Sequence, residues 1–160
     1  MNDNKSAQSN RICTEGDNSF MKPIFIPFRS VGDFVLNSHI DKYINLFDFD
    51  IYKKHNSSFE IINYAIYNPE ITLFLDSKSL LIESIACYEE ILFKGINIIG
   101  KTIDEFMSYT GEKYYGKIDE LDFEDDGISQ FVYEFDDIGL QIWVKGVEGK
   151  IVTAIASGKE

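Results

Sequence analysis

Two segments of this chain resemble one another, and this internal similarity constrains the fold more than any other feature of the sequence. Residues 94–109 read KGINIIGKTIDEFMSY, and residues 31–46 read VGDFVLNSHIDKYINL. An offset of 63 residues aligns Gly95 with Gly32, Ile99 with Leu36, Ile103 with Ile40, Asp104 with Asp41, and Phe106 with Tyr43. In both segments a short apolar run precedes apolar residues at helical spacing. Each segment therefore predicts a short strand followed by a short helix.

The similarity continues toward the C-terminus. Residues 71–75 align with residues 140–144 at an offset of 69, and residues 82–86 align with residues 152–156 at an offset of 70. The offset grows only in the loops, where insertions are tolerated. Any amphipathic α+β chain produces some matches of this kind, but here elements of one type recur in one order. We interpret the chain as a strand–helix–three-strand unit that is used twice.

This repeat predicts the fold class. The half-repeats span about 31–87 and about 94–157, and each has an apolar sheet face and a small helix that cannot close a core alone. Two such units are expected to cover each other. We predict an α+β protein with a curved antiparallel sheet of roughly six to nine strands and two short principal helices, because the short connections force neighbouring strands to be antiparallel.

The individual elements are predicted from periodicity and turn residues. Strands are expected at 33–36, 59–67, 71–75, 80–87, 96–99, 129–135, 140–144 and 151–156, with residues 23–29 as an extended lead-in. A first helix is expected at 40–47, with Ser38 and Asp41 as capping residues. The second helix begins at Thr102, which forms a capping box with Glu105. Trp143 is interpreted as a core residue.

The length of 160 residues favours a single domain. Residues 1–20 are polar and are expected to form a flexible leader. Residues 21–160 are expected to form the single α+β domain. Cys13 and Cys87 fit neither a disulfide framework nor a metal-binding pair. No apolar run reaches the roughly 20 residues that a membrane span needs, and a cytoplasmic protein is expected.

The charge balance limits the kind of partner. The chain has 27 acidic and 15 basic residues, which gives a net charge of −12. Such a surface repels nucleic acids and anionic membranes, because phosphate contacts require cationic side chains. It attracts basic proteins and accelerates their encounter. An excess of acid also keeps proteins soluble, and that simpler role stays open.

No motif for catalysis, metal binding or cofactor binding is found, so the chain is not expected to be an enzyme. His39 lies next to Ser38 and near Asp41, but neighbours on one helix cannot form a catalytic triad. A calcium loop that starts at Asp122 would have Tyr133 where a bidentate glutamate is needed. Two carboxylates, Glu83 and Glu134, lie on otherwise apolar strands. They are the acids to consider if a pocket exists.

The acid is concentrated in one region. Residues 111–137 contain ten acidic residues against Lys113 and Lys117. Tyrosines beside carboxylates are typical of protein-binding surfaces. The candidate partner-binding residues are Tyr114, Tyr115, Asp119, Glu120, Asp122, Glu124, Asp125 and Asp126. The alternative is a solvated acidic loop.

Three stretches carry a resemblance to a known group of proteins. They read IPFRSVGDFVL, ITLFLDSKSLLIESIA and GLQIWVKGVEGKIVTAIAS, and the resemblance spans residues 23–157. In the residue pattern of these stretches and in the order of its elements, the chain resembles bacterial immunity proteins of contact-dependent growth inhibition systems, which are polymorphic toxin systems. The resemblance implies a cytoplasmic protein without enzymatic activity. It also implies that the protein binds the C-terminal domain of a cognate toxin, commonly a basic nuclease, and covers its active or substrate-binding surface.

Two other functions remain open at this point. The first is a small ligand-binding or enzymatic domain with a pocket between the two half-repeats, to which His39, Glu83 or Glu134 would contribute. The second is an adaptor that binds through an exposed strand edge. Neither a cofactor nor a metal is expected in any of these roles.

Overall fold

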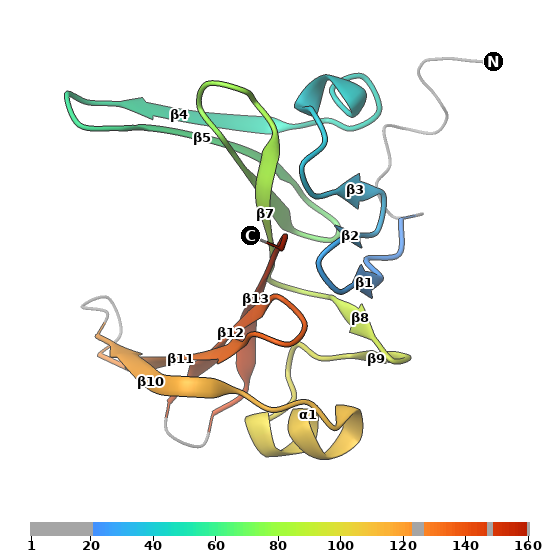
Figure 1. Cartoon of the computed structure of the whole chain (residues 1–160), viewed down its shortest axis with the longest axis vertical. Coiled ribbons are helices and arrows are strands. Elements are labelled where there is room, and N and C mark those ends of the chain that lie inside the picture. The colour runs from blue at the N-terminus through green and yellow to red at the C-terminus, as the bar shows by residue number, and fades with distance from the viewer. Residues whose placement is uncertain (1–20, 123–126, 147–148, 160) are drawn as a thin grey trace.

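The computed structural model describes residues 21–122, 127–146 and 149–159 (Figure 1). One antiparallel sheet of eight strands dominates it, in the order β10-β11-β12-β13-β7-β6-β5-β4. Its strands are β4 (Asp50–His55), β5 (Glu60–Ile66), β6 (Ile71–Leu75), β7 (Ile82–Cys87), β10 (Tyr115–Leu121), β11 (Gln130–Phe135), β12 (Leu140–Lys145) and β13 (Ile151–Ser157). Strands β4–β7 and β10–β13 are each a meander of consecutive strands. The two meanders join where Ile85 of β7 lies opposite Ala156 of β13.

Small elements precede each meander. Before the first lie β1 (Phe25–Ile26), β2 (Ser30–Val31), β3 (Phe34–Val35) and the 3-10 helix η2 (Ile40–Lys42). Before the second lie β8 (Leu92–Phe93), β9 (Ile96–Asn97) and the α-helix α1 (Ile103–Thr110). A small hairpin, a helical segment and a four-stranded meander thus occur twice in the same order. The predicted unit had three strands after the helix, whereas each meander has four.

The predicted α+β class with two principal helices is wrong. The described residues are mostly strand, and their one α-helix is α1. The segment predicted as a helix at 40–47 contains only the three-residue η2, because Ile44 of the predicted apolar stripe is exposed and Phe47 packs against Phe34 from an irregular segment. Ile40 and Tyr43 are buried, but Ile44 and Leu46 are exposed by 39% and 69%. The capping is also different, because His39 is the N-cap and its Nδ1 accepts the N–H of Asp41.

The second helix is confirmed, together with its cap. The hydroxyl of Thr102 accepts the N–H of Glu105, and the Glu105 carboxylate accepts the N–H of Thr102. This reciprocal pairing satisfies two N–H groups that the first turn leaves without partners. Gly111 ends the helix in the left-handed conformation, with φ of 77°.

Six of the predicted long strands are confirmed, as β5, β6, β7, β11, β12 and β13. Strands β4 and β10 were not predicted. Every residue in both is exposed, so their sequences lack the alternation of a half-buried strand. Figure 1 shows why, because hairpins β4–β5 and β10–β11 extend from the body of the protein toward the same side. We call them the first arm and the second arm.

The core lies on one face of the sheet. Large buried side chains from the sheet, such as Ile66, Leu73 and Phe135, pack with Phe34 and Phe106 from the small elements. Burying each such side chain contributes roughly 1.5–3 kcal/mol. In the second half, Phe106 contacts Phe135 edge-on, with ring centroids 5.0 Å apart. The small hairpins and α1 therefore cover one face of the sheet, and no helix or hairpin of the described residues covers the other face. The polar leader predicted at residues 1–20 lies outside the described residues.

Candidate functional site

The uncovered face of the sheet, which we call the open face, carries rows of aligned side chains. Side chains alternate between the faces of a strand, so the neighbours of buried core residues point to the open face. One row runs across five strands: Glu134, Gln141, Ile155, Ala86 and Thr72. The next row contains Ser157, Ser84, Phe74 and Asn63. The open face therefore combines carboxylate, amide and hydroxyl groups with apolar and aromatic side chains.

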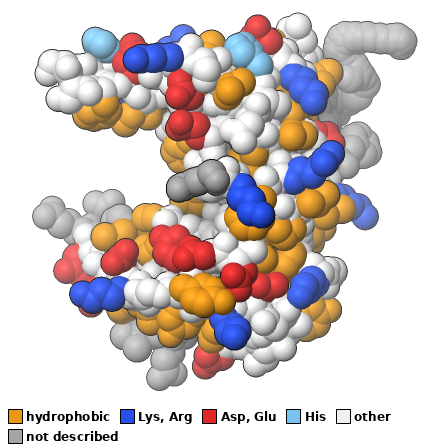
Figure 2. Space-filling view, in the orientation of Figure 1, with side chains coloured by type: hydrophobic (Ala, Val, Ile, Leu, Met, Phe, Trp, Pro, Cys, Tyr) orange, Lys and Arg blue, Asp and Glu red, His pale blue; other side chains and the backbone are white. Residues whose placement is uncertain are grey.

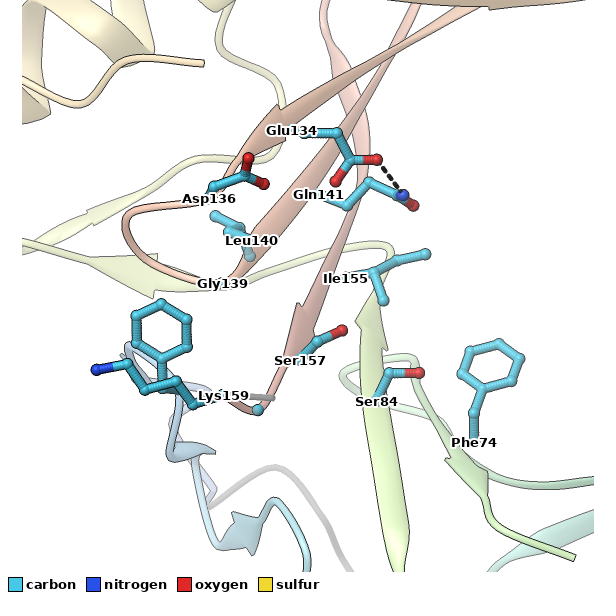
Figure 3. A pocket seen from close by; sticks show the side chains of 12 residues that line it. Phe74, Ser84, Glu134, Asp136, Gly139, Leu140, Gln141, Ile155, Ser157 and Lys159 are labelled. Carbon is cyan, nitrogen blue, oxygen red and sulfur yellow. Dashed lines mark hydrogen bonds between the residues drawn. The ribbon is translucent and has the colours of Figure 1, made fainter. Parts of the chain in front are cut away.

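A groove of about 830 Å³ lies on the open face where the two meanders meet. Figure 3 shows its lining, to which β6, β7, β11, β12 and β13 all contribute. The lining residues are Phe28, Phe74, Ser84, Glu134, Asp136, Gly139, Leu140, Gln141, Ile155, Ser157, Gly158 and Lys159. In Figure 2 the molecule is hollowed between its two arms, and acidic side chains gather on the wall that the second arm forms.

A chain of hydrogen bonds holds one carboxylate in this groove. The indole Nε1–H of Trp143 donates to Oε1 of Gln141 over 2.7 Å, and Nε2 of Gln141 donates to Oε2 of Glu134 over 2.7 Å (Figure 3 shows the second bond). An indole N–H can only donate, so it fixes which end of the Gln141 amide faces Glu134. The side chain of Glu134 is thereby oriented before any partner arrives.

The opposite end of the groove holds an aromatic ring close to the sheet. Gly139 has φ of +65°, and a Cβ at that position would lie 2.7 Å from Cδ1 of Phe28 and from the carbonyl oxygen of Ser157. Only glycine allows the Phe28 ring to pack this closely. The ammonium group of Lys159 lies 5.4 Å from the centroid of the same ring. This end of the groove therefore already holds a cation against an aromatic face.

One buried acceptor on the open face lacks a partner within the described residues. It is Oδ1 of Asn63, which lies next to Phe74 in the cross-strand register. A buried polar atom without a hydrogen bond costs about 1–3 kcal/mol. The unpaired Oδ1 of Asn63 therefore lowers the stability of the fold at this position of the open face.

The predicted partner-binding tyrosines differ in accessibility. Tyr114 is half-buried, and its ring contacts Tyr133 edge-on with centroids 4.9 Å apart, so it lies at the margin of the core. Tyr115 is exposed, and its hydroxyl donates to Oδ2 of Asp137 over 2.8 Å. That hydrogen bond and the charge of Asp137 raise the pKa of the Tyr115 phenol.

Of the predicted acidic residues, Asp119 and Glu120 lie on strand β10, on opposite faces of it. Asp119 lies opposite Val132 and so on the same face as Glu134, whereas Glu120 lies beside Ile118 in a small depression with Phe131 and Tyr133. Asp122 accepts a hydrogen bond from the hydroxyl of Ser129 across the arm. Glu124, Asp125 and Asp126 lie outside the described residues.

Among the residues considered for a pocket, Glu134 alone lines the groove. Glu83 is exposed on β7 outside the lining, and His39 caps η2. Trp143, interpreted as core, is instead half-buried on the open face, because Ile142 and Val144 on either side of it fill the core. The alternation in LQIWVK carries that signal. Nothing in the sequence links Phe28 or Lys159 to this site, since they come from opposite ends of the described chain.

The described thiol does not add nucleophilic chemistry. Cys87 is fully buried on β7, and burial raises its pKa to about 12. A thiol with such a pKa stays protonated at neutral pH and is a poor nucleophile.

Similarity to other proteins does not identify this site. No protein-family model, curated protein or solved structure matches the chain.

Within the described ranges, no helix has the length and hydropathy required to cross a bilayer.

Proposed function

We propose that this protein is an immunity protein of a contact-dependent growth inhibition system. It binds a cognate toxin domain and covers that domain's active or substrate-binding surface, and it has no enzymatic activity of its own. The observation that carries this proposal is the open face, a rigid sheet surface with a groove at its centre and an acidic arm at one side. Loops vary in shape, but strands in a sheet are fixed before binding, which lowers the entropy cost of association.

The charge distribution supports a basic partner. The described part of the second arm carries Asp119, Glu120, Asp122 and Glu134 against one cation, Lys117. In the first arm, two acidic residues are balanced by Lys53 and Lys54. The acid is therefore on one side of the open face, and a basic domain approaching it is oriented as well as attracted. A nuclease domain with a basic substrate site is the kind of toxin that fits.

The same charge supports a cytoplasmic role without nucleic acid or membrane as a ligand. At a net charge of −12, phosphate backbones and anionic lipid surfaces are repelled. A toxin that acts on nucleic acid must do so inside the cell, so its inhibitor belongs in the cytoplasm. The acidic surface of the inhibitor would occupy the site on the toxin that otherwise binds the acidic nucleic-acid substrate.

A small-ligand function is the alternative, and one observation favours it. The groove lies where the two meanders meet, and its volume of about 830 Å³ is within the range of small-molecule sites. Its charged lining groups are Glu134, Asp136 and Lys159, and the described residues that line it include neither histidine nor cysteine. These groups suit binding of a cationic ligand better than nucleophilic catalysis.

Co-expression tests the proposal. The chain is produced together with the toxin encoded next to it, and both rescue of growth and co-purification are measured. Rescue of growth together with a one-to-one complex is expected. Equal killing with and without this protein, or no complex, contradicts an immunity function. Growth rescue by an Asp119→Lys, Glu120→Lys variant that equals rescue by the wild type would show that the acidic arm is not used.

A further inference from the structure

The groove has the chemistry of a socket for one cationic side chain. We infer that it receives an arginine from the partner, whose guanidinium pairs with Glu134 and Asp136. This inference rests on the proposed function in that the occupant is a side chain of a protein. It goes further because it names the residue type and the position of the central contact.

Charge complementarity selects a cation. Glu134 and Asp136 stand two residues apart along one strand direction, and both line the groove, as Figure 3 shows. Two carboxylates at this spacing repel each other, and a cation placed between them removes the repulsion. Lys159 lines the same groove, but its ammonium group is over the Phe28 ring. The protein's own lysine thus occupies the aromatic end and leaves the carboxylate end to a partner.

The geometry favours arginine over lysine. Gln141 donates to Oε2 of Glu134 and holds the carboxylate in one orientation, and no described residue forms a hydrogen bond to the other oxygen. A guanidinium offers five N–H donors in a planar fork, whereas an ammonium is a compact point charge. The fork matches a carboxylate that is already held in one orientation, because it can form two parallel N–H···O bonds to it. Arginine in a pre-formed pocket is also a common source of binding energy in protein interfaces.

The chain contains a built-in reporter for this contact. Trp143 is its single tryptophan, and its indole N–H is bonded to Gln141, the residue that holds Glu134. In ¹⁵N-labelled protein, the indole signal of a two-dimensional ¹H–¹⁵N NMR spectrum therefore reports on the carboxylate without an attached probe group. No other residue contributes an indole signal.

The test uses the full chain and a short probe. A peptide Gly-Ser-Arg-Ser-Gly, blocked at both ends, is titrated into the protein at low salt, with the same peptide containing citrulline as the uncharged control of equal shape. We expect a saturable shift of the Trp143 indole signal with the arginine peptide, a response at least about tenfold weaker with citrulline, and a comparable loss in Glu134→Gln. Glu83→Gln, which removes an exposed carboxylate outside the groove, is expected to bind like the wild type.

Each contrary result has a definite meaning. Equal shifts with arginine and citrulline, or equal binding by Glu134→Gln and the wild type, would overturn the inference. Tighter binding of free L-arginine than of the blocked peptide would also overturn it, because the groove would then belong to a small ligand. If the adjacent toxin binds Glu134→Gln as well as it binds the wild type, the immunity function stands and the arginine contact fails. If the peptide binds as expected but the toxin does not, the socket stands and the immunity function fails.

Discussion

Gln141 lies directly opposite Glu134 in the antiparallel pair β11–β12, and its Nε2 donates to Oε2 of Glu134 over 2.7 Å. The far side of the amide accepts the indole N–H of Trp143. This pair links the sheet register to the groove, because the backbone pairing that builds the fold also aligns the side chains that orient the carboxylate. The first prediction follows from this contact.

Replacing Gln141 with leucine is expected to release Glu134 while leaving the sheet intact. Leucine suits a half-buried strand position but cannot donate, so the loss of stability should be about 1 kcal/mol in urea unfolding. Affinity for the partner or for an arginine peptide should fall, although the carboxylate is still present. The Trp143 indole proton should move upfield as it loses its acceptor. An unchanged indole signal would show that the bonds to Gln141 do not persist in solution.

A second prediction concerns the glycine behind Phe28. Gly139→Ala introduces a Cβ that would lie 2.7 Å from the Phe28 ring at a φ of +65°. We expect a loss of about 2 kcal/mol or more in unfolding free energy, because strain and steric overlap add. Gly95→Ala is the matched control, with φ of +84° and no neighbouring heavy atom within 4 Å. It should cost about 1 kcal/mol from strain alone. Equal losses in the two variants would contradict the close packing of Phe28.

Acid sensitivity is predicted at the start of α1. The N–H of Thr102 lowers the pKa of the Glu105 carboxylate below its ordinary value of 4.5. A lowered pKa in the folded state means that this contribution to stability is complete above pH 4.5 and is lost as the pH falls through the folded value.

The Glu105→Gln variant tests this point. Glutamine keeps the capping box but does not titrate, so the variant should lose part of the acid-induced decrease in melting temperature while it retains its helix. Glu83→Gln, an exposed carboxylate on β7, should keep the decrease of the wild type. Identical pH profiles for Glu105→Gln and the wild type would show that the carboxylate contributes nothing through its charge.

The acidic arm is predicted to act mainly on the rate of association. Asp119→Asn with Glu120→Gln removes two charges from β10, and long-range attraction affects approach more than release. With a basic partner, the association rate constant at low salt should fall by about tenfold and the dissociation rate constant by far less. Removing Asp33 and Asp41, two exposed acids on other parts of the surface, is the control of equal charge. A similar fall in the control would indicate that only net charge matters.

The sequence predicted the strands that help to bury the core and missed those that do not. Strands β6 and β12 alternate between buried and half-buried residues, and this pattern is visible in the sequence. Strands β4 and β10 are exposed throughout, so backbone pairing alone defines them. The helix expected at 40–47 shortens to η2, because Ile44 of the expected apolar stripe is exposed. Phe47 still packs against the core, but it does so from an irregular segment.

The site was less accessible to prediction than the fold. Glu134 was noted as an acid on an apolar strand, but its partner Gln141 becomes evident only through the register of β11 and β12. The interpretation of Trp143 as a core residue is wrong, because the alternation of β12 places it on the open face between the core residues Ile142 and Val144. Phe28 and Lys159 meet through tertiary packing alone. Composition and spacing carry no information about such a contact.

The central claim is that a basic protein partner binds through the open face. Its most direct test is calorimetric titration of the adjacent toxin domain with the wild type, Glu134→Lys and Glu83→Lys, which make the same charge change inside and outside the groove. A charge reversal in a central contact should weaken the complex by about a hundredfold or more, and the same reversal outside the contact by about threefold or less. Equal affinities for Glu134→Lys and Glu83→Lys would contradict the account.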